Sequence, residues 1–550
     1  MDVRELEWQF EAVDLRPVLR WLADPARRAG TGTVKVEPRG GTSQVDIYLD
    51  TSDRRFHRAG YALRVRRKGR STAAGAEATL KEINSDTTAV PGLRSRREVS
   101  ERLPQADPKL LEQSNGPVGE RVRAVAGTKK VRPLFEVRTR RRVLSIEADG
   151  FPPGEVALDE TAIRSGAAGA VTRLHRVEIE APEPALASLR PFVEEMRAAC
   201  RLQPTGMTKY EAGVLTAGLE TDPDAFGPTA IEAEAPIGRV GLAVLRRHFA
   251  AFLAKEPGTR LGDDIEELHD MRVAGRRLRA ALSLFADVLP PSAAQLGEDL
   301  KWVGHSLGPV RDLDVQLEQL DGWLVEVPEA DRDGLAALRS LLEAERSAAR
   351  EAMLTDLDSR RYELFVGRFG RMLRSARGRR SGPASLPARA VAPDLIDERF
   401  RAFCKAAEQI GEDSPSADYH RVRIRGKRLR YALEFLSDLY PGRTRPLIKR
   451  VTALQDILGL HQDAEVAIDR LRRLAVERGA ELRPETIFAM GEIAERYRRS
   501  TVELRGRFPK TYARVVGKAW KSFAKLIEEE RSATFAPPDS TFPADGSETQ

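Results

Sequence analysis

The chain has 550 residues, too many for one hydrophobic core, so we expect about two to four domains. Hydrophobic residues make up 41% and charged residues 31%, as in soluble globular proteins, and no apolar run approaches the roughly 18 residues of a bilayer-spanning helix. The formal charge of +7 comes from 90 Lys and Arg against 83 Asp and Glu, so a nucleic acid, a polyphosphate or a membrane surface could be recognised only where arginines cluster.

The amino-terminal segment and the two cysteines indicate a reducing compartment. MDVRELEWQF has no basic stretch followed by an apolar core, so we expect no signal peptide. Cys200 and Cys404 are too few for a disulfide framework and form no metal-binding pattern. We therefore expect a cytoplasmic protein with two ordinary thiols.

The first part of the chain, to about residue 215, alternates apolar and polar residues in short runs. VRELEWQF, VDIYLDT, YALRVRRKG, EATLKE, LFEVRTRRR, EVALDE and HRVEIEA are typical of an antiparallel sheet or barrel. Helices are expected at 14–23, where Asp14 can cap and Pro17 sits early, and at 184–200.

Charged side chains recur on one face of most of these strands, because residues i and i+2 share a face. If the sheet closes, its interior would be charged; if it stays open, these faces would lie in water. A charged interior suits a metal-bound polyphosphate, because carboxylates bind Mg²⁺ or Mn²⁺ while Arg and Lys hold phosphate oxygens. The residues in question are Glu5, Glu7, Gln9, Arg64, Arg66, Lys81, Arg96, Glu98, Arg138, Arg140, Asp159, Glu178 and Glu180.

The rest of the chain reads as helical and divides in two. An acidic segment with Pro and Gly, residues 219–238, predicts a linker between a β domain at 1–218 and a helical domain at 239–532. A second break at 376–393 separates helical halves of about 239–380 and 393–532. The tail, 533–550, is rich in Pro, Ser, Thr and Asp and is expected to be disordered.

The two helical halves are copies of one another. LHDMRVAGRRLRAALSLFADVLP (268–290) aligns with YHRVRIRGKRLRYALEFLSDLYP (419–441) at an offset of 151. The same offset places SLGPVRDLDV (306–315) on ILGLHQDAEV (457–466). We therefore expect two helical bundles related by a pseudo-two-fold axis. Asp312 and Asp463, which follow the turn-like LG dipeptides, are expected to cap helices or to hold arginines by salt bridges.

Each copy carries a row of cationic side chains on one helix face. Positions 0, +3, +7 and +10 fall within an arc of roughly 80° on an α-helix. Such a row is a solvated face or a polyanion site, and its recurrence behind a leading histidine favours the polyanion. Aromatic residues are too sparse there for base stacking, which counts against single-stranded nucleic acid. The two rows are His269, Arg272, Arg276 and Arg279, and His420, Arg423, Lys427 and Arg430.

The duplicated HxxRVxxxRLR motif followed by LGxxxD resembles the CHAD domain, the conserved-histidine α-helical domain, over roughly 240–530. That resemblance implies inorganic polyphosphate as the ligand, bound in a basic groove between two bundles.

The β part resembles the CYTH domain of the triphosphate tunnel metalloenzymes over about 3–215. ELEWQ is similar to the family's ExExK motif, and YLDT, GYALRVR, ATLK, RREVSE, VALD, VEIE and TKY follow in the family's order. The resemblance implies an eight-stranded antiparallel tunnel that binds or hydrolyses triphosphate with a divalent metal, Mg²⁺ or Mn²⁺. The implied metal ligands are Glu5, Glu7, Asp159, Glu178 and Glu180, and the implied phosphate-binding residues are Arg64, Arg66, Lys81, Arg96, Arg138, Arg140 and Lys209.

Two positions depart from the family pattern. Gln9 stands where the ExExK motif has lysine, and Ser100 follows Glu98 where many members have a second acid. Glutamine can form hydrogen bonds but brings no charge, so we expect a slower reaction. The sequence predicts a metal-dependent phosphohydrolase for triphosphate or short polyphosphate, joined to a polyphosphate-binding helical module. The alternatives are a non-catalytic polyphosphate-binding protein and an enzyme acting on nucleotides or thiamine triphosphate. No residue is assigned as catalytic base.

Overall fold

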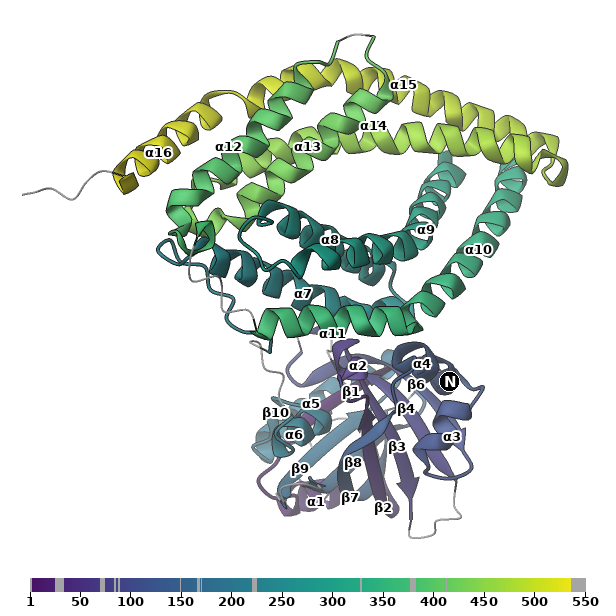
Figure 1. Cartoon of the computed structure of the whole chain (residues 1–550). Helices are drawn as coiled ribbons and strands as arrows, with labels where there is room; N and C mark the ends of the chain where they lie inside the picture. Colours follow the sequence, from purple (N-terminus) through teal and green to yellow (C-terminus); the bar gives the residue numbers. More distant parts are fainter. Residues whose placement is uncertain are drawn as a thin grey trace, which may run out of the picture. The chain divides into compact units, whose positions relative to one another are not determined.

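The computed structural model describes residues 2–24, 34–69, 75–83, 86–87, 90–148, 150–165, 169, 171–219, 225–326, 329–375, 382–411 and 413–535. The chain forms two compact units, shown in Figure 1. The barrel unit comprises Met1–Pro223 with Leu253–Leu268, and the helical unit comprises Asp224–Phe252 with His269–Gln550.

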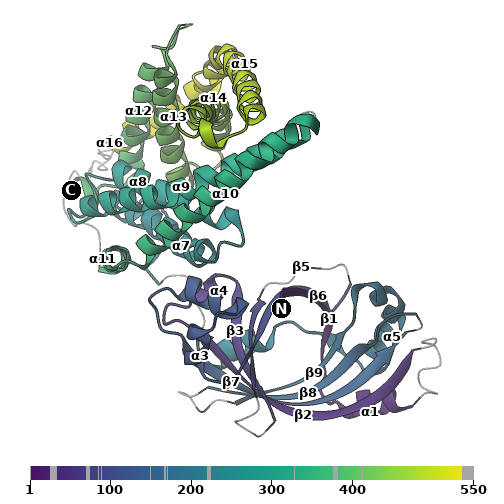
Figure 2. The same cartoon turned by 90° about the vertical axis from the view of Figure 1, so that its right-hand side faces the viewer.

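The barrel unit is built on eight antiparallel strands that close on themselves, as the sequence predicts. The closed order is β1-β9-β8-β7-β2-β3-β4-β6, and β6 pairs back with β1 over Asp2–Trp8. Figure 2 shows these strands curving around a common interior. Two short strands pair with strands of the barrel: β5 (Asp86–Thr87) pairs with β6, and β10 (Gln203–Pro204) pairs with β1. The eight strands are β1 (Asp2–Glu11), β2 (Lys35–Asp50), β3 (Tyr61–Lys68), β4 (Ala76–Glu82), β6 (Leu93–Leu103), β7 (Arg132–Glu147), β8 (Gly154–Arg164) and β9 (Val171–Glu180).

The longest strands, β2 and β7, pair almost end to end. The pairing shifts register between Pro38 and Gly40, where Gly40 has a φ of +108° that other residues rarely adopt.

Helices cover the outer face of the barrel with apolar side chains. α1 (Arg16–Ala23) and α5 (Leu186–Ala199) bury residues such as Trp21 and Phe192 against β1, β7, β8 and β9. α3 (Pro108–Gln113) and α4 (Pro117–Ala126) do the same against β2, β3, β4 and β6, and the short α2 (Arg55–Arg58) joins them through Phe56. Because the apolar faces of the strands point outward to these helices, the opposite, polar faces line the interior.

One part of the interior is apolar and is filled by a helix. α6 (Lys209–Thr216) begins with a capping box at Thr208 and packs Tyr210, Ala212 and Val214 on inward-facing side chains such as Phe135 and Val137. α6 therefore fills the apolar part of the interior, and the charged part remains as a cavity.

From residue 237 onward the chain repeats one five-helix pattern. α7 (Ile237–Leu261), α8 (Ile265–Leu284), α9 (Ala293–Glu326), α10 (Glu329–Asp358) and α11 (Arg360–Ser375) form the first copy. The second consists of α12 (Ala388–Ala407), α13 (Ser416–Phe435), α14 (Arg445–Glu477), α15 (Pro484–Val515) and α16 (Lys518–Phe535). The offset of 151 relates the first residues of α7 and α12 and both ends of α8 and α13, which confirms the predicted duplication.

The two copies meet through their long hairpins. Leu320, Leu338 and Leu342 of α9 and α10 pack with Leu471 and Ile493 of α14 and α15 (Figure 1). The two LG dipeptides, at 307–308 and 458–459, lie inside the helices α9 and α14, and not at turns as the sequence suggested.

The predicted linker and tail are only partly described. Residues 220–224, 376–381 and 536–550 lie outside the described residues. The later part of the expected linker packs on the helical unit, where the Phe226 ring lies 5.1 Å from that of Phe249. Cys200 and Cys404 are free, half-buried thiols. No described helix is long and apolar enough to cross a bilayer.

Candidate functional site

The barrel interior contains a cavity of about 270 Å³ that is lined mainly by charged side chains. Charged side chains reach it from every strand of the closed barrel except β2, and both signs of charge are present, which is the interior predicted for a closed sheet. The charged side chains that line it are Glu5, Glu7, Arg64, Arg66, Lys68, Glu77, Lys81, Glu82, Arg96, Glu98, Arg141, Glu155, Arg176, Glu178, Glu180 and Lys209.

Glutamates of two neighbouring strands form the acidic wall. Glu7 of β1 pairs in register with Glu180 of β9. Glu5 stands two residues before Glu7, and Glu178 stands two residues before Glu180, so all four line the cavity from the inner faces of the two strands. Burial and the neighbouring Glu7 raise the pKa of Glu5 to about 7 and also raise that of Glu180. Glu7 is itself buried, but Lys81 and Arg96 outweigh the burial and lower its pKa.

Lys81 of β4 bridges this acidic wall. Its Nζ contacts the Glu5 carboxylate, lies 3.0 Å from Glu7 Oε1 and lies 3.5 Å from Glu98 Oε2. Arg96 Nη2 donates to the same Glu7 oxygen at 3.0 Å. Lys81 and Arg96, both predicted to bind phosphate, therefore hold carboxylates here.

The two arginines of β3 form a second basic group. Arg66 donates to both oxygens of the fully buried Asp46 at 2.7 and 2.9 Å. Arg64 lies 4.0 Å from Asp46 and from Glu98 and donates to Thr79 Oγ1 at 3.3 Å. Both lie where the sequence predicted, facing the cavity.

Asp159, predicted as a metal ligand, is instead the centre of a buried ion-pair cluster. Arg141 binds both of its oxygens at 2.8 and 2.7 Å, and Lys209 Nζ lies 2.5 Å away. Lys209 also lies 2.8 Å from Glu178, which Arg141 contacts as well. These cations lower the Glu178 pKa well below its usual value despite burial. Asp159 is fully buried and does not line the cavity, so the structure assigns it the role of holding Arg141 and Lys209.

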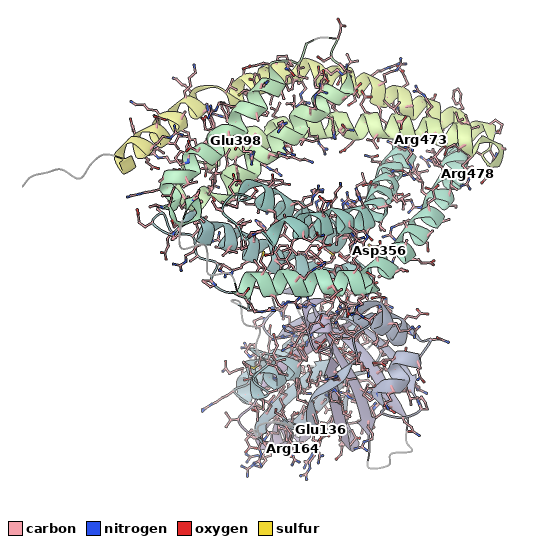
Figure 3. All side chains as sticks on the ribbon, in the orientation of Figure 1. Glu136, Arg164, Asp356, Glu398, Arg473 and Arg478 are labelled. Atoms are coloured by element: carbon pink, nitrogen blue, oxygen red, sulfur yellow. The ribbon has the colours of Figure 1, made fainter. Side chains whose placement is uncertain are left out.

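The predicted phosphate contacts of Arg138 and Arg140 are not supported by their placement. Both side chains lie on the outer face of β7, where Arg138 pairs with Glu136 at 2.5 Å. Figure 3 labels Glu136 and Arg164, a register pair on this outer face. The run RTRRR has arginines at both even and odd positions, so strand alternation alone could not tell which of them face inward. Phe135 and Val137 pack against α6 inside the barrel, so Arg141, which shares their face, also points inward.

Asp46 and Arg176 also belong to the site, but neither was predicted from the sequence. Arg176 stands two residues before Glu178 on β9, so the i, i+2 rule could have placed it on the charged face. Asp46 held a single charge in an otherwise apolar run and gave a weaker signal.

The carboxylates of the acidic wall are the kind of ligand that a hard cation prefers, but in this structure they are not spaced to bind one. Among the residues that the structure describes, no three His, Cys, Asp or Glu side chains are close enough to ligate one ion. The donors are nevertheless carboxylate oxygens, which Mg²⁺ and Mn²⁺ prefer. A cation would also relieve the mutual repulsion that raises the pKa values of Glu5 and Glu180. The chemistry of these carboxylates therefore suits a divalent metal, although their spacing in this structure does not form a metal site.

In the helical unit, the two cationic rows converge on one groove of about 900 Å³. Arg276 and Arg279 of α8 face His420 and Lys427 of α13 across it. Burial, together with the nearby Arg423, Arg276 and Arg430, lowers the Lys427 pKa to about 8, so cations of both copies are near one another. Such a concentration of like charge attracts a polyanion.

The remaining members of the two rows lie beside the groove and do not line it. Arg272 donates to Leu307 O at 3.2 Å and pairs with Asp312 at 3.4 Å, which confirms the expected salt bridge. A Cβ at Gly308 would lie 3.2 Å from Arg272 Nη1, so the glycine of the LG dipeptide gives that guanidinium room.

The second copy differs in detail. His420 Nδ1–H donates to Gln462 Oε1 at 2.7 Å. Arg423 Nε is buried without a hydrogen-bond partner, and burial lowers the Arg423 pKa while Asp463 opposes the shift. Arg430 lies 3.4 Å from Glu434. His269 does not line the groove.

A closed eight-strand antiparallel barrel with a cavity of opposed carboxylates and cations defines the triphosphate-tunnel class of fold. Family models match the CYTH domain over residues 29–210 and the CHAD domain over residues 243–472. The chain therefore contains a CYTH domain and a CHAD domain, joined in one polypeptide, as its motifs predicted.

Solved structures resemble each part separately. The CHAD domain from the plant Ricinus communis is 31% identical, with 52% of this chain and 94% of that chain covered at a TM-score of 0.44. PptA from Streptomyces chartreusis is 22% identical, with 50% and 98% covered at 0.41. HpAC1 from Hippeastrum, a candidate adenylyl cyclase described as having a dominant triphosphatase activity, is 17% identical, with 38% and 94% covered at 0.27. Among curated proteins, none matches this chain.

Proposed function

We propose that the tunnel binds inorganic triphosphate or short polyphosphate with Mg²⁺ or Mn²⁺ and hydrolyses a phosphoanhydride bond. The observation that supports this most directly is the cavity itself, where Arg64, Arg66, Lys81 and Arg96 face a wall of glutamates inside a closed barrel. Phosphoryl transfer depends chiefly on positioning and on charge neutralisation, and this lining supplies both.

The tunnel residues divide the work between substrate and metal. Arg64 and Arg66 would hold phosphate oxygens, with Asp46 fixing the Arg66 fork. Glu5, Glu7 and Glu180 would hold the metal, which when bound neutralises phosphate charge and polarises the reacting phosphorus. Lys81 would pass from the glutamates to the phosphate chain as both ligands enter.

We further propose that the groove of the helical unit binds inorganic polyphosphate. Long polyphosphate is a flexible chain of anions, and the groove presents cations from both copies over one continuous space. The helical unit would capture the chain, and the tunnel would act on triphosphate or on a chain end.

Phosphate release distinguishes the candidate activities. Triphosphate, long polyphosphate, ATP and thiamine triphosphate would each be supplied with Mg²⁺, Mn²⁺ or EDTA. Release from triphosphate that depends on metal supports the proposal. Faster release from ATP or thiamine triphosphate would transfer the activity to those substrates. Binding of polyphosphate without release from any substrate would establish the non-catalytic alternative, in agreement with Gln9 in place of lysine.

A further inference from the structure

Several buried side-chain atoms of the tunnel cavity have no hydrogen-bond partner among the residues that the structure describes. They are Gln9 Oε1, Arg64 Nε, Arg96 Nε and Arg176 Nε. Gln9 is 5% exposed and Arg176 is 1% exposed, and both line the cavity. Buried polar atoms are nearly always satisfied, so a group of such atoms in one cavity indicates a place for a polar ligand.

Gln9 and Arg176 are neighbours on the inner face of the barrel. Gln9 of β1 pairs in register with Glu178 of β9, and Glu11 pairs with Arg176. The two side chains are therefore diagonal neighbours, roughly 7–8 Å apart on adjacent strands. A long arginine side chain covers that separation.

Among the described residues, no carboxylate forms an ion pair with the Arg176 guanidinium, whereas other arginines of the cavity have such a partner. The Arg176 hydrogen bond goes from Nη2 to the carbonyl of Met207 at 2.7 Å. Arg66, Arg96 and Arg141 each contact a carboxylate at 3.0 Å or less. A buried guanidinium with no carboxylate in direct contact destabilises the fold unless an anion binds beside it.

We propose that Arg176 is a phosphate-binding residue of the tunnel, which supplies the positive charge that Gln9 does not carry. The proposal rests on the proposed binding of triphosphate. The ExExK motif carries its cation on β1, whereas in this chain the corresponding cation would be Arg176 on the adjacent strand. The Gln9 amide would still form a hydrogen bond with the phosphate, but without a charge. The Arg176 fork would donate to a phosphate oxygen through Nε and a terminal nitrogen.

Charge exchange between the two positions tests this assignment. The full chain would be compared as wild type, Arg176→Gln, Gln9→Lys and the double variant. With triphosphate and Mn²⁺, Arg176→Gln is expected to raise KM about tenfold or more, the usual effect of losing a charge-assisted hydrogen bond. Gln9→Lys added to Arg176→Gln is expected to recover most of that loss, because it returns a cation to the same place. Arg173→Gln, an exposed change on the same strand, is the matched control and should leave KM unchanged.

The alternative is that Arg176 serves only to hold the Met207 carbonyl. In that case Arg176→Gln would lower the melting temperature, and Gln9→Lys would recover neither KM nor stability. An unchanged KM in Arg176→Gln would also overturn the proposal. If the wild type releases no phosphate, the hydrolase proposal fails separately, and the four proteins are compared by calorimetric titration with triphosphate in EDTA. The same order of affinities would then support Arg176, and equal affinities would refute it.

Discussion

At the scale of single residues, ion pairs divide the cavity glutamates into two kinds. Glu178 is held by Arg141 and Lys209, and its pKa falls well below the usual value. Glu5 keeps a pKa of about 7, because burial and Glu7 together outweigh Lys81. The first kind shapes the site, whereas the second retains charge repulsion that a metal could relieve.

Loss of the glutamates on β1 should abolish metal-dependent turnover. We expect Glu5→Gln with Glu7→Gln to reduce phosphate release from triphosphate by more than about a hundredfold, since even outer-shell partners of a metal are worth 10–100-fold. EDTA should reduce wild-type release to the same level. Glu120→Gln on α4, outside the cavity, is the control. Turnover that survives the double change or EDTA would contradict a metal-dependent tunnel.

The lowered pKa of Lys427 predicts a pH effect on polyphosphate binding. Its pKa of about 8 means that the amine is protonated below pH 8 and loses its charge as the pH rises through that value. We expect the affinity for long polyphosphate to fall roughly tenfold between pH 7 and 9.5 at constant ionic strength. Lys427→Arg should remove most of this decline, since arginine stays charged.

Calorimetric titration at the two pH values measures this effect. Lys301→Arg, a change of the same kind at an exposed site on α9, should leave the decline as in the wild type. An equal decline in the Lys427→Arg protein would show that another group controls the pH dependence.

At the scale of elements, α8 and α13 both contribute side chains to one groove. The offset of 151 relates both ends of these helices, so the duplication repeats the helix as well as the motif. Arg277 of α8 pairs with Glu434 of α13 at 3.0 Å, which ties the two helices together beside the groove. A ligand that lies in the groove therefore contacts both copies.

Both helix faces should contribute to polyphosphate binding. We expect alanine at Arg272, Arg276 and Arg279 to weaken binding of long polyphosphate about tenfold or more, and alanine at Arg423, Lys427 and Arg430 to do the same. Changing both sets should weaken binding far more than either set, because one polyanion that bridges the faces gains effective concentration. Alanine at Arg473, Arg498 and Arg499, exposed residues of α14 and α15, removes equal charge as a control. A loss confined to one set would contradict a shared groove.

At the scale of the whole molecule, the chain joins two kinds of phosphate-binding surface. The cavity inside the barrel has a volume of about 270 Å³, and the groove of the helical unit has a volume of about 900 Å³. The smaller space suits a short phosphate chain, and the larger one suits a long chain.

Polyphosphate should bind the full chain more tightly than duplex DNA of equal phosphate concentration. Duplex phosphates lie on a wide, stiff rod, while polyphosphate is thin and flexible enough to enter the groove. Competition binding at one ionic strength, repeated at higher salt, measures both ligands, and both affinities should fall with salt. DNA binding as tight as that of polyphosphate would move the helical unit to a nucleic-acid role.

The sequence by itself determined the charged strand faces and the duplicated helical rows, because these rest on local periodicity and a fixed offset. Its motifs indicated the two families, and the closed barrel followed from the resemblance to the CYTH domain. Strand alternation placed Glu5, Glu7, Arg64 and Arg66 on the inner face, and a fixed offset exposed the repeat. Only the tertiary structure decided which arginines of β7 face inward, since the run RTRRR fits both parities until α6 packs against Phe135 and Val137. It also decided that Asp159 is an ion-pair partner inside the wall. The place of Arg176 beside Gln9 likewise depends on the register between β1 and β9, which no local pattern encodes.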